Sequence, residues 1–396
     1  MKTLELLAPA GDRECLETAL RFGADAVYIG GPFMQLRSKV TGFSLEEIAD
    51  AVAYTHSLGK KLYVTVNSFA KDREFDAIRS YAKKLYEIGV DAVIVSDLGV
   101  IDVLHEAVPE LPIHVSTQAN CQNAPCANVY ARLGAQRIVL AREMSIEEIR
   151  ELKQGIPETL ELEAFVHGAM CMAYSGRCFI SMYLTGRSGN RGECTQPCRW
   201  RYHLVEQKRP NEFFPIEEDD QGTTLLSSRD MKCITFLDEL IDAGVTSFKI
   251  EGRMKSPYYV ATVVNAYRHA LDGDTPMELL ERELDCISHR PYCGGFYYGE
   301  LKTYEPDDDM AYHQDKVFAG VVKGWENGRV TVEQRNCFAV GDVFEVVTPQ
   351  KIGLSFTAEN MVNAENEPVD RAPHPQELIT MDCPFPLLPG DILRKR

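Results

Sequence analysis

The sequence lacks any long hydrophobic run. No stretch of its 396 residues approaches the ~18 uninterrupted apolar residues that a membrane-spanning helix needs. The first residues, MKTLELLAPAGD, reach Pro9 and Gly11 before any apolar run of the length found in a secretory signal peptide. We therefore expect a cytoplasmic protein without a membrane partner.

Positive charge is scarce. The chain has 42 Lys and Arg residues against 59 Asp and Glu residues, a formal net charge of −17. A uniformly acidic surface repels nucleic acids and anionic lipids, so any polyanionic partner must bind at a local basic patch. The composition is otherwise that of an ordinary globular protein, and the length is sufficient for two domains.

Familiar catalytic motifs are also missing. The sequence contains neither His-Glu-x-x-His, a zinc motif of metalloproteases, nor Gly-x-Ser-x-Gly, the nucleophile motif of α/β-hydrolases. The motifs therefore give little support to a peptidase function. Their absence does not exclude one, because a catalytic triad can assemble from residues far apart in the chain. In a reducing compartment the 12 cysteines are not expected to form a disulfide framework.

A recurrent phrase in the first 250 residues indicates alternating helices and strands. A glycine follows each helical pattern and precedes a β-branched run, as at Gly23, Gly89, Gly134 and Gly244. Glycine suits the position after a helix, and an apolar run suits a strand buried on both faces of a parallel sheet. The expected strands are 4–8, 26–30, 62–67, 92–96, 113–117, 137–141, 160–166 and 246–251.

Eight strands that alternate with amphipathic helices predict an α/β fold, a TIM-type (β/α)8 barrel. Helices are expected at 44–56, where Ser44 opens a capping box, and at 74–88. The same alternation is compatible with an open doubly wound sheet, which is the alternative. In a barrel, the active site would lie at the C-terminal ends of the strands.

The connection before the last strand is far too long for an ordinary barrel loop. We therefore predict an insertion at 168–245 within a barrel domain of residues 1–304. The acidic stretch 305–315 is typical of a linker. Short strand patterns with Gly-Asp turn signals follow, so residues 316–396 are predicted to form a small β-barrel domain.

Four cysteines stand close together in the insertion, with six, fifteen and three residues between them: Cys171, Cys178, Cys194 and Cys198. Four thiolates can ligate either a tetrahedral zinc ion or an iron–sulfur cluster. Structural zinc sites usually contain two Cys-x2-Cys pairs, so this spacing favours a cluster over zinc. The alternative without metal is four packed, buried thiols, but the neighbouring residues are glycines, arginines and polar residues rather than a core pattern.

The insertion also carries a local basic patch. Residues 171–210 contain seven basic and two acidic side chains, a net charge of +5. Trp200, Tyr183 and Tyr202 add aromatic rings that could stack on the unpaired bases of RNA. The alternative is a solvated loop whose arginines offset the nearby acidic run 217–220. The basic residues are Arg177, Arg187, Arg191, Arg199, Arg201, Lys208 and Arg209.

Polar residues follow the predicted strands, where a barrel core should be apolar. They are Asn67, Asp97, Gln118, Arg142 and His167. On the last strand, Lys249, Glu251 and Arg253 alternate and therefore face one side. Such a ring could bind a small anion, with Arg142 and Arg253 as forks for a carboxylate.

The segment 163–181, EAFVHGAMCMAYSGRCFIS, resembles the signature of the collagenase-like peptidase family U-32. LLAPAG near the start, RGECTQPCRW, and KIEGRMKSPYYV after the last strand extend the resemblance over nearly the whole chain. The family was named for peptidases, but its better understood branches resemble RNA and quinone hydroxylation proteins that hold a four-iron cluster. The Cys-Thr-Gln-Pro-Cys-Arg-Trp run and the C-terminal β domain are most similar to the branch that hydroxylates the wobble uridine of tRNA.

The resemblance implies an oxygen-independent hydroxylation of tRNA that requires prephenate. It also implies a 4Fe-4S cluster on Cys171, Cys178, Cys194 and Cys198. Another branch takes its fourth ligand from farther downstream, which makes Cys233 the alternative to Cys198. We predict catalytic roles for Glu163, His167 and Glu251. Substrate contacts are predicted for Asn67, Gln118, Arg142, Lys249, Arg253, Arg199 and Trp200.

Two other functions are compatible with the sequence. One is a true peptidase, metal-dependent or unassigned, and the other is a non-catalytic module that binds a partner within a larger complex. For the hydroxylating enzyme the expected partners are tRNA and a small carboxylate metabolite. Either a homo-oligomer or a hetero-oligomer is compatible with the sequence.

Overall fold

The computed structural model describes residues 4–36, 42–171, 173–200, 217–219, 222–224, 229–299 and 312–396. Within these ranges, no helix is long and apolar enough to cross a membrane. The chain divides into two compact units. The first lies within residues 1–16, 24–254 and 290–312, and the second within 17–23, 255–289 and 313–396.

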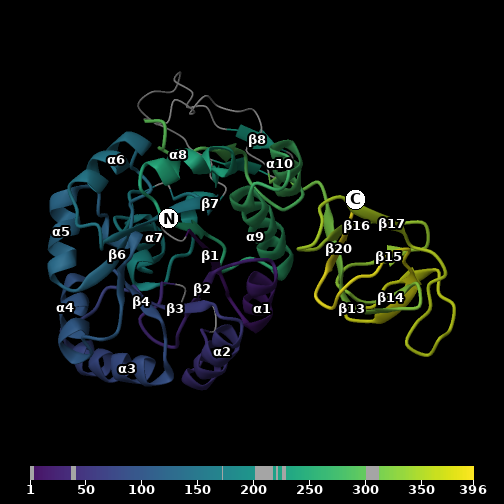
Figure 1. The fold of residues 1–396 in the computed structure, drawn as a ribbon, viewed down its shortest axis with the longest axis horizontal. Helices are drawn as coiled ribbons and strands as arrows, with labels where there is room; N and C mark the ends of the chain where they lie inside the picture. The colour runs from purple at the N-terminus through teal and green to yellow at the C-terminus, as the bar shows by residue number, and fades with distance from the viewer. Residues whose placement is uncertain are drawn as a thin grey trace. The chain divides into compact units, whose positions relative to one another are not determined.

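Eight parallel strands of the first unit form a closed barrel (Figure 1). Each strand from β1 to β7 pairs with the next along the chain, and β11 closes the ring by pairing with β7 and β1. This closure excludes the open doubly wound sheet and confirms the TIM-type barrel. The strands are β1 (Glu5–Pro9), β2 (Ala26–Gly30), β3 (Lys61–Val66), β4 (Ala92–Val95), β5 (Ile113–Val115), β6 (Ala135–Val139), β7 (Glu161–Ala169) and β11 (Ser247–Ile250).

Helices connect successive strands, and α2 to α6 surround the barrel in Figure 1. The capping box predicted at Ser44 is confirmed, because its hydroxyl accepts from the Glu47 N–H and the Glu47 carboxylate accepts from the Ser44 N–H. Helix α3 ends at Gly89, whose φ of 88° lies in the left-handed region that favours glycine. The helices of this series are α1 (Arg13–Arg21), α2 (Leu45–Ser57), α3 (Phe75–Ile88), α4 (Leu98–Ala107), α5 (Ala124–Arg132) and α6 (Ile146–Gln154).

The insertion leaves the barrel through an extended β7. This strand runs to Ala169, three residues beyond the predicted end, and its extension pairs antiparallel with β10. Strand β12 then pairs with β10. The elements that the insertion adds, with β12 from farther along the chain, are α7 (Ile180–Thr185), β8 (Glu217–Asp219), β9 (Gly222–Thr224), β10 (Asp230–Lys232), α8 (Leu237–Asp242) and β12 (Tyr292–Cys293).

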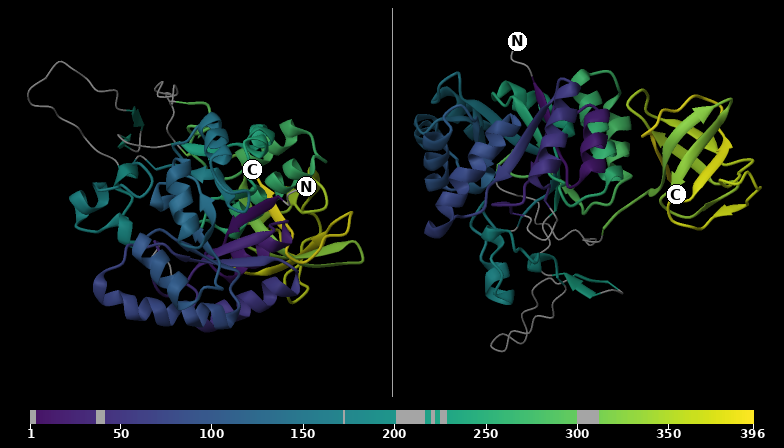
Figure 2. Two further views of the ribbon diagram at one scale, coloured as in Figure 1. Left: turned by 60° about the vertical axis from the view of Figure 1, so that its left-hand side comes forward. Right: turned by 90° about the horizontal axis from the view of Figure 1, so that it is seen from below.

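The second unit contains a C-terminal domain of antiparallel strands (Figure 2), as predicted from the strand patterns. Its six-stranded sheet has the order β17-β16-β20-β13-β14-β19, and β15 pairs with β18. Helices α9 (Pro257–Asp272) and α10 (Met277–Asp285) belong to the same unit, where Arg394 pairs with Glu283 of α10 at 2.6 Å. The strands are β13 (Val317–Glu326), β14 (Arg329–Gln334), β15 (Phe338–Ala339), β16 (Val343–Val347), β17 (Leu354–Thr357), β18 (Arg371–Ala372), β19 (Leu378–Asp382) and β20 (Ile392–Lys395).

Candidate functional site

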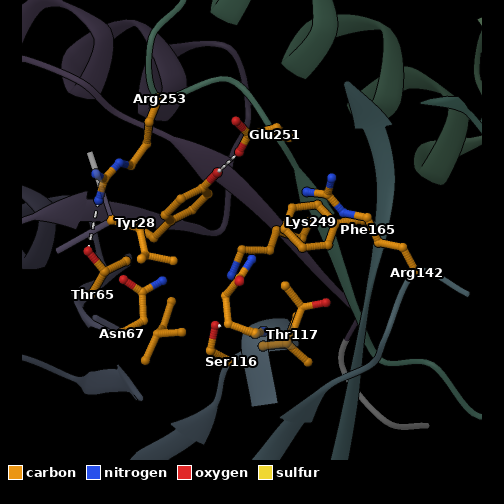
Figure 3. Close-up of a pocket in the computed structure, with 14 residues that line it drawn as sticks. Tyr28, Thr65, Asn67, Ser116, Thr117, Arg142, Phe165, Lys249, Glu251 and Arg253 are labelled. Carbon is orange, nitrogen blue, oxygen red and sulfur yellow. Dashed lines mark hydrogen bonds between the residues drawn. The ribbon is translucent and has the colours of Figure 1, made fainter. Parts of the chain in front are cut away.

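A pocket of about 80 Å³ opens at the C-terminal ends of the barrel strands (Figure 3). We call it the strand-end pocket. The chain folds so that residues following β3, β5, β6 and β11 converge there, which is the usual place for an active site in this fold. Six of the residues predicted from the sequence line it: Asn67, Gln118, Arg142, Lys249, Glu251 and Arg253. The pocket is also lined by five residues that were not predicted from the sequence: Tyr28, Thr65, Ser116, Thr117 and Phe165.

Arg142 presents a cation that has no anionic partner within the described ranges of the chain. Its guanidinium carbon lies 3.9 Å from the centroid of the Phe165 ring, and one amino group donates to the Ala169 carbonyl at 2.9 Å. Its Nε is buried and has no hydrogen-bond partner among the described residues. Since a buried donor without an acceptor costs free energy, an anionic ligand that accepts from Arg142 would be stabilised here.

Arg253 lies on the other side of the same pocket (Figure 3). It donates to Thr65 Oγ1 and to Gln35 Oε1, both at 2.8 Å, so neutral acceptors fix its orientation. Gly30 makes room for this arrangement. A Cβ at that position would lie 2.0 Å from Gln35 Oε1 and 2.7 Å from Arg253 Nη1.

Lys249 is held at the pocket by the buried carboxylate of Glu163. The Lys249 ammonium lies 2.8 Å from Glu163 Oε1 and 4.5 Å from the centroid of the Tyr28 ring. Glu163 is fully buried and does not line the pocket. Glu163 does not contact the cavity, so the structure gives no support to its predicted catalytic role. Its position instead allows it to orient Lys249.

An ion network fills the barrel interior below Lys249. Arg137 binds Glu163 at 3.0 Å and also pairs with Glu5, which accepts a hydrogen bond from the Tyr63 hydroxyl at 2.6 Å. Burial alone would raise the pKa of the Glu5 carboxyl, but the Arg137 charge and these hydrogen bonds outweigh it and lower the pKa. Burial, together with the charges of Arg137 and Lys249, lowers the pKa of His114 well below its usual value. Glu5 therefore stays ionised in the same interior as a neutral imidazole.

Glu251 is the single carboxylate among the described residues that line the strand-end pocket. The Tyr28 hydroxyl lies 3.3 Å from Glu251 Oε2 and 3.0 Å from the Ile250 carbonyl oxygen, so it can donate to either (Figure 3). A carboxylate oriented by a hydroxyl donor can accept a proton from a bound molecule. Of the three predicted catalytic residues, Glu251 is the one that contacts the cavity.

All four cysteines of the insertion line a second pocket of about 130 Å³, which we call the cysteine pocket. The two pockets share a wall made by Leu36, Thr117, Gln118, Arg142 and Glu251. Residues that face the small cavity therefore also face the thiols. A molecule bound at Arg142 would lie next to whatever the cysteines hold.

Specific contacts hold the cysteine-bearing segment against the barrel. Glu143, just after β6, accepts from the Ser175 backbone N–H at 2.8 Å. Gly176 has a φ of 73°, and a Cβ there would lie 2.1 Å from the Gln118 carbonyl oxygen, so this close approach requires glycine. Arg191 pairs with Glu74 at 2.9 Å and donates to the Phe69 carbonyl. The segment between Cys171 and Cys194 is thus tied to three barrel loops.

The chemistry of the donor set fits a thiolate-ligated iron–sulfur cluster or zinc. None of the 12 cysteines is in a disulfide, and the Gln196 backbone N–H lies 3.4 Å from Cys194 Sγ, a contact that stabilises a thiolate. In the described part of the chain no three His, Cys, Asp or Glu side chains are grouped closely enough to hold an ion. All four thiols line one pocket, so these residues would hold such a group there.

Cys233 lies elsewhere. It is fully buried after β10, its backbone N–H donates to the Val166 carbonyl, and it lines neither pocket. Burial raises the pKa of its thiol well above the usual value, which disfavours the thiolate that a metal requires. These observations favour Cys198, which lines the cysteine pocket, over Cys233 as the fourth ligand.

Other predicted site residues lie outside both pockets. His167 is buried opposite Lys232 of β10, with its ring centroid 5.6 Å from that of Tyr292. Asp97 caps α4 by accepting from the Gly99 N–H at 2.9 Å. Trp200 is exposed, and its indole N–H donates to the Thr195 carbonyl at 3.2 Å. The side chain of Arg199 and residues 201–216 are outside the described part of the chain.

Sequence comparison places this barrel and its C-terminal domain in one family. Residues 11–305 match the model of peptidase family U32, and residues 314–394 match the model of the peptidase family U32 C-terminal domain. The chain belongs to peptidase family U32.

The chain is similar to proteins whose names indicate different activities. The chain is 37% identical to tRNA hydroxylation protein P1 of Bacillus subtilis over 406 residues, 100% of this chain and 95% of that protein. It is 42% identical over 276 residues to a 23S rRNA 5-hydroxycytidine synthase of Escherichia coli, covering 68% of this chain and 39% of that protein. It is also 33% identical over 313 residues to a collagenase of Porphyromonas gingivalis, covering 75% and 74%.

Proposed function

We propose that the protein hydroxylates RNA, specifically the wobble uridine of tRNA, with a 4Fe-4S cluster and with prephenate as a required small carboxylate. The observation that carries this proposal is the wall shared by a cationic pocket and a four-cysteine pocket. Full-length similarity to a tRNA hydroxylation protein, and similarity to an rRNA hydroxycytidine synthase, support the RNA substrate. Such a substrate is consistent with a cytoplasmic location.

Each group of residues has a distinct part in this proposal. Cys171, Cys178, Cys194 and Cys198 would hold the cluster, which when bound supplies one-electron redox chemistry. Arg142 and Arg253 bind carboxylate groups from two sides of the strand-end pocket, and Lys249 adds a third cation, oriented by Glu163. Glu251 lies within hydrogen-bonding distance of the bound molecule and accepts a proton from it.

A peptidase is the second candidate, favoured by the family's name and by the collagenase relative. A thiol nucleophile would need a neighbouring base, usually histidine. Among the residues that the structure describes, no histidine lines either pocket. The geometry therefore supports RNA hydroxylation better.

Nucleoside mass spectrometry tests the function. The gene, expressed in a bacterial host that lacks its own wobble-uridine hydroxylases, is expected to restore the 5-hydroxyuridine signal in digested tRNA. The purified, anaerobically handled protein is expected to need both prephenate and unmodified tRNA for the same product. Cleavage of gelatin or peptides by the pure protein, with no change in the nucleoside, would establish the peptidase instead.

Replacing Arg142 by alanine is expected to weaken the dependence on prephenate without removing iron. A charge-assisted hydrogen bond contributes ~1.5–3 kcal/mol, so the half-saturating prephenate concentration should rise roughly tenfold to hundredfold. Arg142→Lys should recover part of this loss, because the charge remains while the planar fork is lost. Arg79→Ala, which removes an exposed arginine of α3 paired with Asp76, is the control. An unchanged prephenate response in Arg142→Ala would place the carboxylate elsewhere.

A further inference from the structure

The cysteine-bearing segment exposes four aromatic rings to solvent. The exposed fractions are 58% for Tyr174, 67% for Phe179, 78% for Tyr183 and 43% for Trp200. We call these four residues the aromatic face. All four rings lie within 27 consecutive residues, and aromatic rings left exposed in one short segment can contact a binding partner. In both views of Figure 2, the region around α7 projects from one end of the barrel.

The charges beside the aromatic face are mainly positive. Arg177 and Arg187 are exposed, and Glu193 is the single acidic residue between 173 and 200. The Glu193 carboxylate accepts from the Ser188 N–H at 3.3 Å. Arg191, which the charge pattern grouped with this patch, is instead tied to Glu74 and the Phe69 carbonyl. Two arginines of the described segment therefore remain available to contact phosphate.

We propose that the aromatic face docks a single-stranded part of an RNA, with bases stacked on Phe179 and Tyr183 and phosphates bound by Arg177 and Arg187. Aromatic rings interleaved with arginines are the recognition chemistry of unpaired nucleotides, because every base has a face that can stack. Rigid duplex RNA cannot present its bases in this way. This inference rests on the proposed RNA substrate.

The position of the aromatic face matches this role. Phe179 directly follows Cys178, and Trp200 stands two residues after Cys198, so the face and the cysteine pocket belong to one short segment. The Trp200 indole is fixed by its hydrogen bond to the Thr195 carbonyl, and the Thr195 N–H in turn donates to Ser181 Oγ at 3.1 Å. A docked loop could therefore leave one base near the cysteine pocket while its neighbours stack on the face.

Fluorescence anisotropy with a labelled RNA hairpin tests the surface. The full-length protein is expected to bind a hairpin with an unpaired loop more tightly than a fully paired duplex of the same length. Phe179→Ala and Tyr183→Ala should each weaken hairpin binding, from about fivefold to more than a hundredfold, with little change in its salt dependence. Arg177→Ala with Arg187→Ala should instead reduce the salt slope by about 1.4, since each single-strand phosphate contact contributes ~0.7.

Tyr86→Ala is the matched control, because Tyr86 is an exposed tyrosine of α3, 47% exposed, outside the aromatic face. Unaltered hairpin binding in the Phe179→Ala, Tyr183→Ala double variant would contradict the proposal that RNA docks on the aromatic face. Equal affinity for hairpin and duplex would also contradict it. Binding of phosphatidylglycerol vesicles in place of the hairpin would show that the aromatic face contacts lipid instead.

The experiments distinguish failure of the proposed docking surface from failure of the proposed function. If the double variant keeps its hairpin affinity while the wild-type protein still hydroxylates tRNA, the surface is wrong and the function stands. If the variants lose hairpin binding but no nucleoside changes in cells, the surface stands and the function is wrong.

Discussion

Cys178→Ser and Cys194→Ser proteins, purified without oxygen, are expected to contain almost no iron and no acid-labile sulfide. Both side chains are half-buried and line the cysteine pocket, so each is positioned to supply a thiolate. Removal of outer-shell partners alone lowers metal affinity by ~10–100-fold, and removal of a ligand should exceed that loss. Iron and sulfide quantitation, together with the visible absorbance of thiolate-bound iron, measures the effect.

The other cysteines supply the controls for this experiment. Cys126→Ser changes a half-buried thiol that lines neither pocket, and it should retain the wild-type iron content. Cys233→Ala discriminates between the two candidates for the fourth ligand. Retained iron in Cys233→Ala and lost iron in Cys198→Ser would assign the ligand to Cys198, and the reverse pattern would assign it to Cys233. Stoichiometric zinc without sulfide in the wild-type protein would contradict the cluster.

The barrel could be predicted because its signals are local. Four of the eight strands are short apolar runs after a helix-ending glycine, and the closed pairing of β11 with β7 follows once eight alternating units are present. The strand-end pocket could be predicted for the same reason, since polar residues at the C-terminal ends of parallel strands must meet at one end of the barrel.

Partnerships between distant residues could not be predicted. Nothing near Arg191 in the sequence indicates that Glu74, on a different barrel loop, neutralises it. The sequence likewise shows that Glu163 is an acidic residue within an apolar strand. It does not show that Arg137 and Lys249, from two other strands, meet it inside the barrel. Glu163 was therefore assigned a catalytic role that its buried position does not favour.

Glu163→Gln is expected to lower the free energy of unfolding by about 3–5 kcal/mol, the range observed when one partner of a buried ion pair is removed. Glu163 is fully buried and contacts Arg137 at 3.0 Å and Lys249 at 2.8 Å, both of them cations with little exposure. A glutamine of the same shape leaves two buried cations with less negative charge to offset them. Urea denaturation at neutral pH, followed by far-UV circular dichroism, measures the change.

A second carboxylate that pairs with Arg137 provides a matched control. Glu161 lies 2.7 Å from Arg137, but its side chain is 50% exposed, so water screens the pair. Glu161→Gln should therefore lower the free energy of unfolding by no more than ~1 kcal/mol, as for other exposed ion pairs. Equal effects of the two substitutions would show that the barrel interior is hydrated and that Glu163 does not fix Lys249. A large effect of Glu163→Gln alone, accompanied by weaker prephenate binding in the protein that remains folded, would identify Glu163 as the residue that positions Lys249 at the strand-end pocket.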